Sequence, residues 1–262
     1  MYAMERQEQI ERFLNTEGRV AVADLALRFD VTTETIRRDL DALEQTGALR
    51  RVHGGAVAHL DRSSTLEPSV RERAQVHGAQ KRAIAARALT AIEPGFRGSI
   101  FLDAGSTTAV IAEQLPARLA EVEGQAEVVT HALSFAAALA DADRIALTVI
   151  GGRVRSVTSA AVGARTVAAV RALRPDIAFV GTNGVSAGFG LSTPDPEEAA
   201  VKEAIVHGAQ RVVAVADASK FGRELLVGFA ALSDVDVLVT DAEPAASLAS
   251  ALDDADTEVW LA

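Results

Sequence analysis

Hydrophobic residues between positions 5 and 47 recur every three or four residues, which is the spacing of amphipathic helices. The pattern predicts three helices: one from about Glu5 to Thr16 that buries Ile10, Phe13 and Leu14, one from about Ala21 that buries Val22, Leu25, Ala26 and Phe29, and one after Val31 that buries Ile36, Leu40 and Leu43 and ends at Gly47. Thr32 is the expected N-cap of the third helix. Because only residues 29–32 connect the second and third helices, we expect a helix-turn-helix.

After Gly47 the pattern changes to that of a short hairpin. Leu49–Val52 has strand character, residues 53–55 form a turn, and Ala56 and Val57 begin a second strand, so a small wing is predicted. Residues 58–80 are polar, contain Pro68 and show no sustained period, which is typical of a connection with some helix near its end. We therefore expect a first domain over residues 1–57, a linker over 58–80 and a second domain over 81–262.

In the second domain, apolar strand patterns alternate with helical patterns. Strands are expected at residues 99–103, 127–130, 146–152, 177–181, 211–217, 235–241 and 257–261, and helices at 83–89, 108–115, 166–173, 196–210 and 244–252. This alternation predicts an α/β fold with a mainly parallel sheet that helices cover on both faces.

Composition narrows the possible functions. No run approaches the roughly 20 apolar residues of a membrane span, and the charged start does not read as a signal peptide, so we expect a cytoplasmic protein. The chain has no Cys, and its five His show no metal-binding spacing, so no metal or cofactor is expected. The net charge is -10, and residues 1–60 hold eight Arg against ten Asp or Glu. Nucleic acid repels such a protein, so DNA contact would need a local basic surface.

The arginine pairs of residues 37–38 and 50–51 are the candidates for that surface. With the apolar stripe of the third helix turned inward, hydroxyls and guanidinium groups occupy its exposed N-terminal face, the part that enters a major groove. The alternative is that Arg37 and Arg38 are solvated charges paired with Glu34 or Asp41. The helix-turn-helix spacing, the second pair and the double glycine favour DNA. The expected DNA-binding residues are Thr32, Thr33, Thr35, Arg37, Arg38, Arg50, Arg51, His53, Gly54 and Gly55.

Loops at the carboxyl ends of the predicted strands carry a second candidate site, because ligands of parallel sheets bind there. Residues 104–108 read AGSTT and open a helix, so they could hold a phosphate at the helix N-terminus. Taken singly, such a turn could be plain N-capping, Glu198 and Lys202 a surface ion pair, and Lys220 an exposed lysine. Their convergence at one sheet edge favours a site. The expected ligand-binding residues are Asp103, Gly105, Ser106, Thr107, Thr108, Thr130, Gly152, Arg153, Gly181, Thr182, Asn183, Glu198, Lys202, Asp217 and Lys220.

Both parts of the chain resemble one family. The stretch VADLALRFDVTTETIRRDLDALEQTGALRRVHGGA resembles the winged helix-turn-helix of the DeoR family of bacterial transcription regulators. The segments LDAGSTT, VIGG, AFVGTNGV, GLSTPDPEEAAVK and ADASKFG resemble its sensor domain, which shares its fold with ribose-phosphate isomerases and binds phosphorylated sugars. The resemblance implies a homodimeric or homotetrameric repressor that a sugar phosphate releases from double-stranded operator DNA.

The sequence also resembles family members of high-GC bacteria that govern fructose use, which makes fructose 1-phosphate the first expected effector. His131 departs from the family, which commonly has asparagine there. The family also carries an arginine and a lysine at the spacing of Arg73 and Lys81, which implies either a structural or a ligand-side role.

Two other classes of function compete with this interpretation. A sugar-phosphate isomerase would need a base and an electrophile, and Asp103, Glu198 and Lys220 are available. The lysine and glycine-rich turn typical of the isomerase is missing, however, and an isomerase has no use for the first domain, so no enzyme is expected. The remaining rival is a winged helix that binds protein rather than DNA.

Overall fold

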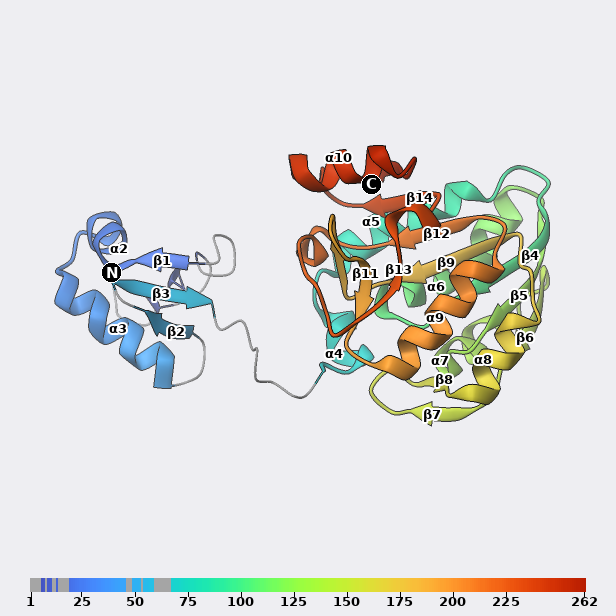
Figure 1. Cartoon of the computed structure of the whole chain (residues 1–262), viewed down its shortest axis with the longest axis horizontal. Coiled ribbons are helices and arrows are strands. Elements are labelled where there is room, and N and C mark those ends of the chain that lie inside the picture. Colours follow the sequence, from blue (N-terminus) through green and yellow to red (C-terminus); the bar gives the residue numbers. More distant parts are fainter. Residues whose placement is uncertain are drawn as a thin grey trace. The chain divides into compact units, whose positions relative to one another are not determined.

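The chain of the computed structural model divides into two compact units, Met1–Leu66 and Glu67–Ala262 (Figure 1). The structure describes residues 6–7, 9–10, 13, 19–45, 49–52, 54–58 and 67–262. The division lies within the expected linker of residues 58–80, and the later part of that linker belongs to the second unit. There it forms helix α4 (Val70–Gln75) and the start of α5 (Gly78–Ala88).

The first unit contains the predicted helix-turn-helix and wing. Its described elements are β1 (Arg19–Ala21), α2 (Val22–Phe29), α3 (Thr33–Gln45), β2 (Leu49–Val52) and β3 (Gly55–Ala58). The strands form an antiparallel sheet in the order β1-β3-β2. Sequence patterning did not predict β1, because three residues are too few to show a period. Described residues of the first predicted helix are helical, whereas Leu14 and Gly47 lie outside the described residues.

Two local features explain why these elements form. The N–H of Thr35 donates to Oγ1 of Thr32 at 3.2 Å, which confirms Thr32 as the cap of α3. Ile10, Leu25, Phe29, Ile36, Leu40 and Leu43 are buried together as predicted.

The double glycine of the wing has a backbone cause at both positions. Gly54 has a φ of +83°, in the region where only glycine is unstrained. At Gly55, a Cβ would collide with the carbonyl oxygen of Val20 on β1. The two glycines therefore shape the turn and let β1 approach β3.

The second unit is built on a seven-stranded parallel sheet, within residues 67–262, all of which are described. In spatial order its strands are β15 (Glu258–Leu261), β14 (Val237–Thr240), β12 (Val212–Val215), β9 (Ile177–Gly181), β4 (Arg97–Leu102), β5 (Gln125–Thr130) and β6 (Ile145–Val149). Every residue of β9, β12 and β14 is buried, as expected for central parallel strands.

Helices cover both faces of this sheet, as predicted (Figure 1). One apolar cluster joins alternate strand residues to α5, α6 (Ser106–Glu121) and α7 (Leu133–Leu139). The other joins the opposite strand face to α8 (Ala164–Arg171), α9 (Pro196–Gly208) and α10 (Ala246–Asp254). In the part of the chain that the structure describes, no helix is both long and apolar enough to cross a membrane.

Sequence patterning missed the smaller elements of the second unit. These are helix α7, the hairpin of β7 (Arg153–Arg155) and β8 (Ala160–Val162), and an antiparallel sheet of β10 (Gly184–Ser186), β11 (Gly190–Thr193) and β13 (Val227–Ala230). Each of these strands has only three or four residues, too few to show alternation.

Candidate functional site

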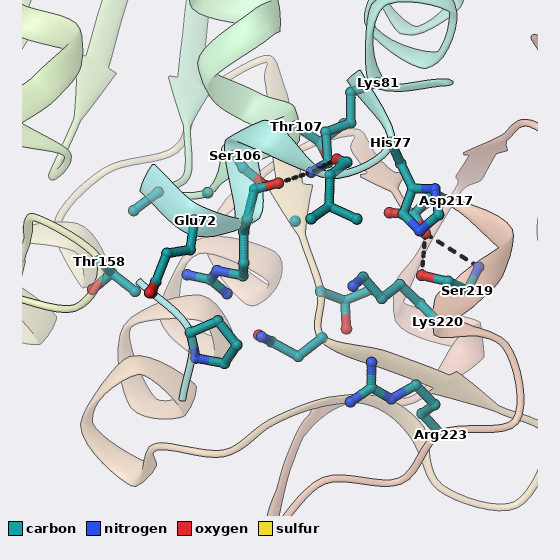
Figure 2. A pocket seen from close by; sticks show the side chains of 18 of the residues that line it. Glu72, His77, Lys81, Ser106, Thr107, Thr158, Asp217, Ser219, Lys220 and Arg223 are labelled. Atoms are coloured by element: carbon teal, nitrogen blue, oxygen red, sulfur yellow. Dashed lines mark hydrogen bonds between the residues drawn. The ribbon is translucent and has the colours of Figure 1, made fainter. Parts of the chain in front are cut away.

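A pocket of about 340 Å³ lies in the second unit, where loops follow strands β4, β9 and β12 (Figure 2). This is the sheet edge that the sequence predicted, because parallel strands end at one edge. The pocket is lined by Pro68, Glu72, Arg73, Val76, His77, Lys81, Ala104, Gly105, Ser106, Thr107, Thr158, Gly181, Thr182, Asn183, Glu198, Lys202, Asp217, Ser219, Lys220 and Arg223.

The first turn of α6 forms one side of the pocket. Ser106 and Thr107 line it, directly after Gly105. The first N–H groups of a helix have no carbonyl partner within the helix, and the helix dipole adds partial positive charge. Thr108 instead is fully buried and donates to the carbonyl of Gly105 at 3.1 Å, so its hydroxyl closes the turn.

Two cations face this turn from the loop after β12. Figure 2 shows Lys220 and Arg223 reaching into the pocket. Neither makes an ion pair with a carboxylate among the described residues. Burial lowers the pKa of Lys220 below its ordinary value, and the charges of Arg223 and Arg73 lower it further, against the opposing effect of Asp217. The pocket therefore has an excess of positive charge that an anion would relieve.

Lys81 adds a buried positive charge at the same pocket. Its Nζ donates to the carbonyl of Val76 at 2.7 Å and to the carbonyl of Arg73. Burial lowers the pKa of Lys81, an effect that Asp217 opposes and that Lys220 and Arg73 reinforce. Because its ammonium bonds two carbonyls at the end of α4, Lys81 combines a structural role with a charge near the pocket.

Polar groups of another character line the opposite side. Thr158 donates to the carboxylate of Glu198, which Nη1 of Arg155 also contacts at 3.1 Å. The amide of Asn183 accepts from the hydroxyl of Thr193 at 3.1 Å, which orients it at the pocket. Carboxylates and amides of this kind suit the hydroxyl groups of a sugar.

A buried ion pair supports the pocket from behind. Asp103 is fully buried, and its Oδ2 accepts from Nζ of Lys202 and from the N–H of Gly181 at 2.9 Å. Burial would raise the pKa of Asp103, but Lys202 and the neighbouring His131 hold it below its ordinary value. The pair fixes the loop after β4 to the loop after β9.

His131 lies behind the pocket, beside the ion pair of Asp103 and Lys202. Its Nδ1 is 2.8 Å from the carbonyl of Ala161, and its Nε2 accepts from the N–H of Ala104 at 3.2 Å. The side chain is buried and does not line the pocket. In this chain, histidine therefore holds the loop that precedes the α6 turn.

The structure brings ten of the fifteen predicted ligand-site residues to the pocket. These are Gly105, Ser106, Thr107, Gly181, Thr182, Asn183, Glu198, Lys202, Asp217 and Lys220. The others do not line it: Asp103, Thr108, Thr130, Gly152 and Arg153.

The structural positions of these five explain why. Asp103 pairs with Lys202 behind the pocket, and the hydroxyl of Thr108 closes the α6 turn. Thr130 is buried and donates to the carbonyl of Leu102 at 2.7 Å. Gly152 packs so closely on Thr166 that a Cβ would not fit, and Arg153 is exposed and pairs with Glu197.

Several residues that line the pocket are not among the expected ligand-binding residues. Five residues between 68 and 77, in the expected linker, form one wall with Lys81. The others include Thr158, Ser219 and Arg223. Only the family spacing of Arg73 and Lys81 hinted at this wall, because no local pattern marks it.

On the first unit, the exposed face of α3 carries the predicted arginines. The side chains of Arg37 and Arg38 are 54% and 80% exposed, and both lie near Glu34, at 3.5 and 3.9 Å. Arg51 differs from expectation, since its guanidinium turns back onto α3, where it meets Asp41. It thus links the wing to the helix. His53 and the side chain of Arg50 lie outside the described residues. No cluster that could hold a metal occurs in the described parts of either unit.

Comparison with known proteins covers both units. The profile of the DeoR-like helix-turn-helix domain matches residues 6–61, and that of the DeoR C terminal sensor domain matches residues 76–242. The regulator FruR of Bacillus subtilis is 35% identical over 93% of each chain. A putative aga operon transcriptional repressor of Escherichia coli O157:H7 is 32% identical, over 90% of this chain and 86% of its own.

A more distant relative and a solved structure complete the comparison. The glycerol-3-phosphate regulon repressor of Escherichia coli K12 is 29% identical over 97% of each chain. Ribose 5-phosphate isomerase A of Methanocaldococcus jannaschii overlaps 55% of each chain at 20% identity and a TM-score of 0.41, too partial a likeness to say anything of activity. The full-length relatives are named as regulators and not as enzymes. The chain belongs to the DeoR family of transcription regulators.

Proposed function

We propose that this regulator represses sugar-metabolism genes and that a phosphorylated sugar releases it from its operator. The observation that carries the proposal is the pocket in which the α6 N-terminus faces two cations, Lys220 and Arg223, that make no ion pair within residues 67–262. A phosphate group suits this arrangement because it accepts from backbone N–H groups and from ammonium and guanidinium donors together.

The opposite side of the pocket supplies the sugar contacts in this proposal. Glu198 and Asn183 would bond hydroxyl groups, while Ser106, Thr107 and Lys220 hold the phosphate. A volume of about 340 Å³ is in the range of small-ligand pockets. Fructose 1-phosphate remains the first candidate, followed by other ketose and aldose phosphates. The name of the glycerol-3-phosphate regulon repressor supports a small phosphorylated ligand in general.

DNA binding is assigned to α3 and the wing. Thr33, Thr35, Arg37 and Arg38 would enter the major groove, and a symmetric homodimer or homotetramer would present two or more such helices to repeated half-sites. The sugar phosphate must prefer the state that does not bind DNA, since a ligand shifts an equilibrium only through differential affinity.

Fluorescence anisotropy of labelled DNA from upstream of the protein's own gene tests the proposal. The full-length protein is titrated at fixed salt with and without a panel of sugar phosphates that includes fructose 1-phosphate. Tight binding that one sugar phosphate reverses is the expected result. Binding that no panel member reverses would contradict the sensor assignment.

A salt titration of the same complex separates DNA from a protein partner as the target of the winged helix. Phosphate contacts make the affinity fall steeply as salt rises. No binding to the DNA, or binding that salt does not affect, would contradict the operator assignment.

A further inference from the structure

The pocket wall formed by residues 67–77 is also the beginning of the second unit. We call these residues the strap. Pro68, Glu72, Arg73, Val76 and His77 all line the pocket. In Figure 2, Glu72 lies toward Thr158 and His77 toward Ser219, so the strap spans the pocket. The chain continues from the strap to the DNA-binding unit through residue 66.

Polar contacts, and not core packing, hold the strap in place. Its helix α4 has only six residues, and none of them is buried. The N–H of Val70 donates to the carbonyl of Val157 at 2.7 Å, and Lys81 holds the carbonyls at the end of the helix. A segment with few buried apolar contacts moves at low free-energy cost.

Glu67 connects the strap to the ligand side of the pocket. Its side chain is only 8% exposed, and Oε2 accepts from Nη2 of Arg155 at 2.7 Å. The same Arg155 contacts Glu198, a pocket residue, at 3.1 Å. Burial alone would lower the pKa of Arg155, but the charges of Glu198, Glu67 and Asp195 together raise it above its ordinary value. An unbroken series of charged contacts therefore runs from the pocket to the first residue of the unit.

The link between Glu67 and Arg73 is the weak point of this series. Nη1 of Arg73 lies 3.3 Å from Oε1 of Glu67, as an ion pair. Among the described residues, however, neither that buried Oε1 nor the buried Nε of Arg73 has a hydrogen-bond partner. Since charge-assisted hydrogen bonds are stronger than such a contact, a phosphorylated ligand in the pocket would compete with Glu67 for the guanidinium of Arg73.

We propose that the strap is the ligand-responsive element of the sensor and that Glu67 couples pocket occupancy to the point where the chain leaves the unit. In the arrangement described above, Glu67 holds Arg73 and Arg155 together. A bound anion draws Arg73 into the pocket, Glu67 loses one partner, and the start of the unit shifts. This inference rests on the proposed function, because it takes a sugar phosphate as the ligand.

The variant Glu67→Gln tests the coupling in the full-length protein. Glu67 does not line the pocket, so the affinity for fructose 1-phosphate, measured by calorimetry without DNA, should stay within about threefold of the wild-type value. That change is small compared with the roughly 5- to 150-fold factor by which an allosteric effector typically changes the affinity at another site. The ratio of operator affinities without and with fructose 1-phosphate should fall at least about fivefold toward one. Arg71→Gln, which removes an exposed charge from the same helix, should keep the wild-type ratio.

Each result has a distinct meaning. If the wild-type protein is released and Glu67→Gln is released equally well, the strap proposal is wrong and the proposed function stands. If fructose 1-phosphate and the rest of the panel fail to release even the wild-type protein, the proposed function fails and the strap proposal fails with it.

Hydrogen exchange on the wild-type protein gives a second test that does not depend on the variant folding. Addition of the releasing sugar phosphate should change exchange of backbone amides in residues 68–77 as well as at the α6 turn. A change at the α6 turn with none in residues 68–77 would overturn the strap proposal.

Discussion

The half-buried ammonium of Lys220 gives the pocket a specific pH dependence. Its pKa is lowered by burial and by neighbouring cations, so in the ligand-free protein it loses its proton at a lower pH than an ordinary lysine. Anion affinity should therefore weaken as pH rises through that lowered pKa. A sugar phosphate is already a dianion above about pH 7, so its own titration does not contribute there.

We expect calorimetric titrations of the wild-type protein with fructose 1-phosphate to show this loss at a lower pH than that at which an ordinary lysine loses its proton. Lys220→Arg keeps its charge over the whole range and should bind nearly independently of pH. Lys220→Gln should lose about tenfold or more in effector affinity at neutral pH and keep operator affinity. Parallel pH profiles for the wild type and Lys220→Arg would refute this role of Lys220.

The sequence predicted the sheet edge at which Asp103 lies but not the contacts that its carboxylate makes there. Its place after a strand predicted a ligand contact, yet it is buried behind the pocket with Lys202. Sequence alone could not distinguish these roles, because both put a carboxylate at the same sheet edge.

Asp103→Ala should therefore act on stability, since it leaves the Lys202 ammonium buried without a counter-ion. We expect a loss of about 3–5 kcal/mol in the free energy of unfolding, measured with urea. The exposed Asp143→Ala serves as control, with a change within about 0.5 kcal/mol. Because the folded-state pKa of Asp103 is lowered, its contribution is present above its ordinary pKa and is lost as pH falls through the lowered value.

At the scale of elements, regular periodicity decided what the sequence could predict. Helices α2 and α3 and the central strands β9, β12 and β14 were found because burial on one side or on both leaves a long pattern. Residues 67–77 were assigned to the linker because their position depends on Glu67 meeting Arg155, 88 residues away in sequence. No local pattern encodes such a contact, so one wall of the site could not be predicted.

Helix α3, the proposed recognition element, carries its own prediction. Arg38 is 80% exposed and its pairing with Glu34 is long, at 3.9 Å, so the guanidinium is available to DNA. Arg38→Ala should lower operator affinity by about 1–3 kcal/mol and leave fructose 1-phosphate binding unchanged. Arg82→Ala on α5 removes the same charge from an exposed site of the other unit and should have little effect. Equal losses in the two variants would point to total charge instead of a local contact.

At the scale of the whole molecule, the proposed function requires an acidic chain to hold a polyanion and a small anion at separate sites. If the two sites are coupled, operator DNA should weaken sugar-phosphate binding by the same factor by which the sugar phosphate weakens operator binding. Calorimetry with fructose 1-phosphate on the free protein and on its operator complex measures the first factor, and anisotropy measures the second. DNA of scrambled sequence is the control. Unequal factors would mean that further states, such as a change of assembly, take part.

The strap also determines how the sensor has to be isolated. The family profile begins at residue 76, but Pro68, Glu72 and Arg73 precede that position and line the pocket. A fragment cut at the profile boundary would lack that wall and the Glu67 bridge, whereas a fragment that begins before residue 67 retains both. Ligand screens on the shorter fragment would therefore measure a different pocket from the one that the complete regulator uses.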